Sequence, residues 1–128
     1  MRSLPILLAA CIAFVALASA PTAGAGTRRA TDSEARIRFT LDDRLLTVRV
    51  LPGAPRRVRR QLYGNRIRAT CGTSFVFISG VKVDRTRLWP RGRRRVRFRF
   101  RRNISRRAKW CLLERRGRDV ALAGFTSR

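Results

Sequence analysis

A row of arginines is the feature of this sequence whose residue types and spacing could do chemistry. Between positions 95 and 101 every second residue is arginine, and valine or phenylalanine fills the positions between them. This alternation has the period of a β-strand, so the guanidinium groups would share one face. Residues two apart on a strand lie about 6.6–6.8 Å apart, close to the phosphate repeat of an extended polyanion. Arginine binds phosphate, sulfate or carboxylate through two parallel hydrogen bonds, which makes the row a candidate anion-binding site.

Neighbouring arginines extend this candidate site. Arginines flank the row on both sides, and the basic segment 56–60 adds more. From Arg85 to Lys109 there is no acid, although Asp, Glu, Thr or Ser would serve equally well for solvation. The competing interpretation is a solvated strand face for which a codon-biased, bacterial genome supplies arginine. The candidate anion-binding residues are Arg57, Arg60, Arg93, Arg95, Arg97, Arg99, Arg101 and Arg102.

The charge balance predicts the class of partner. The chain has 31 Lys+Arg, 7 Asp+Glu and no His, for a formal net charge of +24. Charges balance from Gly26 to Asp43, whereas the chain from Arg44 onward contains 26 bases and three acids. Such a field attracts an anionic polymer or an anionic membrane surface. A protein partner is the alternative.

The absence of histidine excludes most common catalytic arrangements. Ser-His-Asp and Cys-His catalysis need a histidine base, and zinc sites rely on histidine and cysteine. No glycine cluster has the spacing of a phosphate-binding loop. Asp42 and Asp43 are expected at a hairpin tip, while Asp84, Glu114 and Asp119 are isolated among arginines and expected to form salt bridges. We therefore expect no enzymatic activity, no metal and no cofactor.

The beginning of the sequence predicts an export signal. Arg2 precedes an apolar run from Leu4 to Ala20 and then small residues, the pattern of a secretory signal peptide. We expect residues 1–25 to be this signal, with cleavage between 18 and 25, and a secreted or cell-envelope protein. One alternative is lipidation of Cys11. The other is an uncleaved anchor, because about 17 apolar residues reach the lower limit for spanning a bilayer.

Two cysteines follow the predicted signal, Cys71 and Cys111. An even pair in an exported chain predicts a disulfide. Closing a loop of about 40 residues should stabilise the fold by about 4 kcal/mol if the effect is entropic. For a small, self-repelling domain this is a large share of the total stability.

The elements that must position these residues are mostly short strands. Period-two alternation predicts a hairpin over 35–41 and 45–51, and Pro55 and Gly64 bound a short helix over about 55–63. Further strands are expected at 66–71, 75–79, 81–83, 93–102, 110–115 and 119–125, with one helical turn at 103–109. Residues 26–34 are expected to be a disordered lead-in to a single domain, 35–128. Six or seven short strands indicate a small antiparallel β-sandwich or open barrel.

Aromatic residues add little to a nucleic-acid interpretation. Phe98 and Phe100 alternate with arginine and should face the core, which leaves Trp89 and Trp110 as candidates for exposure. Two such residues are too few to argue base stacking. The sequence therefore favours a non-catalytic polyanion-binding module for an envelope polymer, extracellular nucleic acid or anionic lipid. The alternatives are a structural or interaction domain of the envelope with merely solvated arginines, and a cationic protein that attacks membranes.

Overall fold

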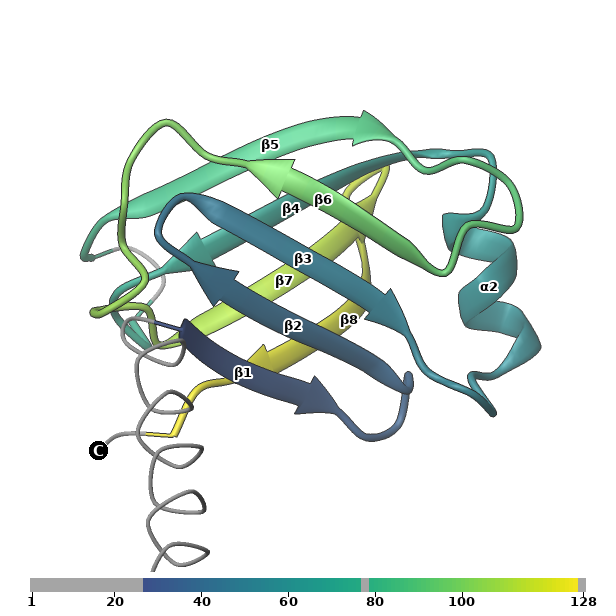
Figure 1. Cartoon of the computed structure of the whole chain (residues 1–128), viewed down its shortest axis with the longest axis horizontal. Helices are drawn as coiled ribbons and strands as arrows, with labels where there is room; N and C mark the ends of the chain where they lie inside the picture. Colours follow the sequence, from purple (N-terminus) through teal and green to yellow (C-terminus); the bar gives the residue numbers. More distant parts are fainter. Residues whose placement is uncertain (1–26, 77–78, 127–128) are drawn as a thin grey trace, which may run out of the picture.

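The computed structural model describes residues 27–76 and 79–126, which form two antiparallel sheets packed face to face (Figure 1). In the first sheet the strand order is β1-β2-β3-β6, with β1 (Thr27–Asp32), β2 (Ile37–Asp42), β3 (Leu45–Val50) and β6 (Arg95–Arg99). In the second it is β5-β4-β7-β8, with β5 (Lys82–Leu88), β4 (Arg66–Gly72), β7 (Trp110–Arg115) and β8 (Arg118–Gly124). One helix, α2 (Arg56–Leu62), connects β3 to β4.

The predicted small antiparallel β-sandwich with one short helix is confirmed, with eight described strands rather than six or seven. Helix α2 buries only Val58 and Leu62, which lie four residues apart and form a narrow apolar stripe. The predicted signal peptide, its cleavage site and its two alternatives lie outside the described residues.

The core lies between the two sheets and follows from period-two alternation. Every second residue of β2 and of β3 is buried, which confirms the predicted hairpin. Trp89 is fully buried, packs 6.5 Å from the Phe98 ring centroid, and donates its indole N–H to the Arg93 carbonyl at 2.7 Å. Trp110 is also buried. The expectation that these two tryptophans could be exposed was therefore wrong, because the core and a nearby loop cover them.

The predicted disulfide is present between Cys71 on β4 and Cys111 on β7. The two residues are directly opposite in the strand register, with their Cα atoms 4.1 Å apart and 40 positions between them in sequence. Both side chains are fully buried. A buried disulfide fits a protein that folds in an oxidising compartment.

The expected disordered lead-in is instead strand β1, which pairs with β2 along its whole length. Its sequence lacks hydrophobic alternation, and Ala30 is its only buried residue. Tertiary hydrogen bonds hold it in place. The Arg28 guanidinium donates to the carbonyls of Ala108 at 2.9 Å and Thr126 at 3.0 Å, and also contacts those of Ser105 and Arg106. Asp32 accepts a hydrogen bond from the Leu122 amide at 2.9 Å.

The strand expected at residues 75–79 is absent from the described part of that segment. Phe75 and Val76 are exposed, and the backbone turns so that the Ser79 amide donates to the Val76 carbonyl at 3.0 Å. Ser74 and Ser79 bridge through their hydroxyls at 3.0 Å, which favours a turn over extended pairing. The following strand, β5, is longer than predicted and runs from Lys82 to Leu88.

Replacing Arg28 with glutamine is expected to lower the free energy of unfolding by about 2–3 kcal/mol, because charge-assisted hydrogen bonds to carbonyls are lost. Urea denaturation measures this change. The matched control is Arg29→Gln, on the exposed side of the same strand, where we expect a change within about 0.5 kcal/mol. Equal losses in the two variants would contradict the role given to Arg28.

Candidate anion-binding site

Strand β6 presents its arginines on the outer face of the first sheet. Arg95, Arg97 and Arg99 are exposed, while Val96 and Phe98 are buried against the core. The predicted alternation is therefore confirmed for three members of the row. The fourth, Arg101, is exposed but follows the end of the strand, so it does not continue the row as strand geometry would require.

Strand register brings two further arginines beside this row. Arg95 is opposite Arg49 on β3, and Arg49 is opposite Arg38 on β2. Residues opposite each other on neighbouring strands share a face, with strands about 4.7–4.9 Å apart. A row across the sheet therefore meets the row along β6 at Arg95. The resulting surface, here called the arginine face, consists of Arg38, Arg49, Arg95, Arg97 and Arg99.

The rest of this surface is mostly hydroxyl-bearing. Thr47 is opposite both Arg97 and Thr40. Thr40 is in turn opposite Arg29 on β1, so two threonines lie between two arginines. Among the residues of the four strands of this sheet, one acid, Asp42, lies on the same face as these arginines. Asp42 is opposite Leu45, which is opposite Arg99. Like charges opposite each other on neighbouring strands are destabilising. A bound anion would relieve this repulsion.

A hollow at the edge of the sandwich borders the arginine face. It has a volume of about 270 Å³ and is lined by Arg87, Pro90, Arg93, Arg95, Val96 and Arg97. Arg87, on β5, donates to the Arg97 carbonyl at 2.7 Å and so joins the edges of the two sheets. Three of the candidate residues, Arg93, Arg95 and Arg97, therefore line one hollow. Arg87 lines it too, although the sequence did not indicate this residue.

The other predicted members of the site are dispersed. Arg57 and Arg60 are exposed on α2, where Arg60 lines a different hollow together with Arg91. Arg101 and Arg102 follow the opposite end of β6. These four residues contribute to the overall positive field but are not part of the arginine face.

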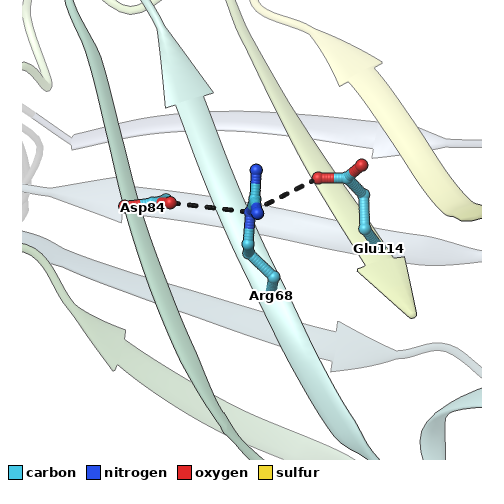
Figure 2. Close-up of polar contacts among 3 residues, drawn as sticks. All are labelled: Arg68, Asp84 and Glu114. Carbon is cyan, nitrogen blue, oxygen red and sulfur yellow. Dashed lines mark ion pairs between the residues drawn. The ribbon is translucent and has the colours of Figure 1, made fainter. Parts of the chain in front are cut away.

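Ion pairing is concentrated on the second sheet. Arg68 lies between Asp84 and Glu114, with its Nε atom 3.5 Å and 3.6 Å from their carboxylate oxygens, and the three residues come from adjacent strands (Figure 2). Salt bridging is thus confirmed for Asp84 and Glu114. The expectation for Asp119 was wrong within the described residues, because this exposed side chain has no base within 4.0 Å.

Unlike Arg68, the arginines of the arginine face form no ion pair among the described residues. Within residues 27–76 and 79–126, no carboxylate lies within 4.0 Å of its five guanidinium groups. Its charge is therefore left for solvent or an external anion to balance.

The same described residues contain no group of three or more His, Cys, Asp or Glu side chains placed to hold a metal ion. None of the helices in the described ranges is long and apolar enough to cross a membrane. Comparison with protein-family models, curated proteins and solved structures finds no match for this chain.

Proposed function

We propose that this is a secreted, non-catalytic module that binds anionic polymers through the arginine face. The observation that carries the proposal is the pair of crossing arginine rows, whose charge no described carboxylate neutralises. Binding would combine bidentate contacts to phosphate, sulfate or carboxylate groups with release of the polymer's counterions.

The shape and chemistry of the face favour a polymer backbone as the ligand. Strand β6 offers three guanidinium groups in line, and Arg38 and Arg49 offer contacts to a chain that crosses the sheet. Thr40 and Thr47 can add hydroxyl hydrogen bonds between them. Trp89 and Trp110 are buried, so neither tryptophan offers a platform for base stacking. Recognition would therefore depend on charge and spacing rather than on bases.

A salt titration on immobilised dextran sulfate tests this function. With three to five contacts, log K should fall linearly with log salt concentration with a slope of about −2 to −5. Neutral dextran is the control and should retain no protein. A flat response to salt, or equal retention on neutral dextran, would contradict polyanion binding and leave the arginines as solvated surface.

A further inference from the structure

The connection between β4 and β5 holds two large apolar side chains in solvent. Phe75 is 66% exposed and Val76 is 57% exposed. The turn that carries them is hydrogen-bonded, since the Val76 amide donates to the Ser74 hydroxyl at 3.1 Å and the Ser79 hydroxyl donates to the Val76 carbonyl at 3.2 Å. Exposed apolar groups held in a defined position indicate an interaction surface.

Two glycines of the second sheet make room for aromatic rings at this turn and beneath it. A Cβ atom on Gly124 would lie 3.8 Å from the Phe75 ring, so that ring lies over the glycine. The buried Trp110 ring lies so close to Gly72 that a Cβ there would clash with it. The Trp110 indole donates to the Ser74 carbonyl at 2.7 Å, which fixes the base of the turn to the sheet. We call the two exposed side chains, Phe75 and Val76, the apolar tip.

Both lysines of the chain border the apolar tip. Lys82 is opposite Gly72 in the strand register, and the Lys109 amide donates to the Gly72 carbonyl at 2.7 Å. All other bases are arginine. A lysine can lay its apolar stem along a hydrocarbon boundary while its ammonium group reaches polar headgroups.

Exposed arginines add positive charge at this end of the sandwich. Arg106 and Arg107 lie in the connection between β6 and β7, which Arg28 ties to the start of β1. Of the acids near this end, Asp42 and Asp43 lie where β2 turns into β3 in the other sheet. Asp84 is two residues from Lys82 on β5 and is paired with Arg68.

The first described strand begins at the same end of the sandwich. Strand β1 begins where β4 and β8 end, as Figure 1 shows, and Arg28 hydrogen-bonds to the Ala108 and Thr126 carbonyls there. The start of β1 and the connection that carries Arg106 and Arg107 are therefore at the end of the domain that carries the apolar tip.

We propose that this end of the sandwich docks on an anionic phospholipid bilayer. Phe75 and Val76 enter the boundary between headgroups and acyl chains, and Lys82 and Lys109 contact the lipid phosphates. The net charge of +24 disfavours a second copy of the chain as the occupant. This docking surface is separate from the arginine face, so either proposal can fail without the other.

Sedimentation with vesicles of phosphatidylcholine containing about 30% phosphatidylglycerol tests the docking, because this composition supplies the negative surface potential. Phe75→Ala should reduce the partition coefficient about tenfold. The matched control is Leu88→Ala, which removes a side chain 54% exposed at the other end of β5, and should change the coefficient less than about twofold. Equal melting temperatures of the variants would show that both fold.

A second readout reports depth of insertion. In the presence of vesicles, the tryptophan introduced by Phe75→Trp should show blue-shifted emission and quenching by brominated acyl chains. The tryptophan introduced by Leu88→Trp should show neither effect. Vesicle binding that is indifferent to Phe75→Ala, with no quenching in the Phe75→Trp variant, would overturn the proposal. Loss of a captured protein partner in Phe75→Ala with unchanged vesicle binding would likewise overturn it, and would assign the tip to that partner.

Discussion

Replacing Cys71 and Cys111 together with alanine is expected to lower the free energy of unfolding by about 4 kcal/mol. The disulfide closes a loop with a sequence separation of 40, so its loss restores the conformational freedom of that segment in the unfolded chain. For a domain of about 100 residues this corresponds to a fall in Tm of about 15–25 °C. Guanidinium denaturation followed by the fluorescence of buried Trp89 measures the change.

The effect should be large for this domain because its net positive charge opposes compaction. Wild-type protein treated with a reductant should show the same loss as the double variant, and the double variant should not respond to reductant at all. A difference of less than about 1 kcal/mol between oxidised and reduced protein would show that β4 and β7 hold their register without the covalent bond.

Replacing Arg95, Arg97 and Arg99 with glutamine is expected to weaken binding to dextran sulfate by about 100- to 1000-fold at low salt. Each lost contact also removes about 0.7–0.9 from the magnitude of the salt slope, so the three together should remove about 2–3. The substitutions relieve repulsion on an exposed strand face and should not lower the melting temperature. Salt titration and thermal denaturation of the same preparation give both results.

The control for this variant removes the same charge from the second sheet. Arg66, Arg116 and Arg118 are exposed on β4, in the turn after β7 and on β8, away from the arginine face. Their replacement with glutamine should weaken binding less than about fivefold, through the overall field alone. Equal losses in the two triple variants would mean that total charge, and not the arginine face, determines binding.

The sequence predicted those elements whose signals are local. In β2, β3 and β6 a buried apolar residue at every second position matches the period of a strand that is covered on one side. The disulfide could also be predicted, since Cys71 and Cys111 are the two cysteines that follow the predicted signal segment. These signals require no knowledge of which strands become neighbours.

The parts that could not be predicted depend on contacts between distant residues. Strand β1 has no apolar alternation and is held by hydrogen bonds of Arg28 and Asp32. The partners of Arg28 lie 77 to 98 positions away in sequence, and the partner of Asp32 lies 90 positions away. Arg38 and Arg49 join the candidate site only because β2, β3 and β6 adopt one register. The strand predicted from Phe75 onward was wrong, because an apolar run predicts burial even where hydroxyl hydrogen bonds form a turn.

The Arg28 side chain, on the first strand of the domain, donates a hydrogen bond to the Thr126 carbonyl, which follows the last strand. The two ends of the domain are one side chain apart, so a short linker could join them into a closed loop. New ends could then be opened at Arg116 and Gly117, the two positive-φ residues between β7 and β8. Such a circular permutant would keep every strand pairing while freeing both ends from the membrane-facing side proposed above.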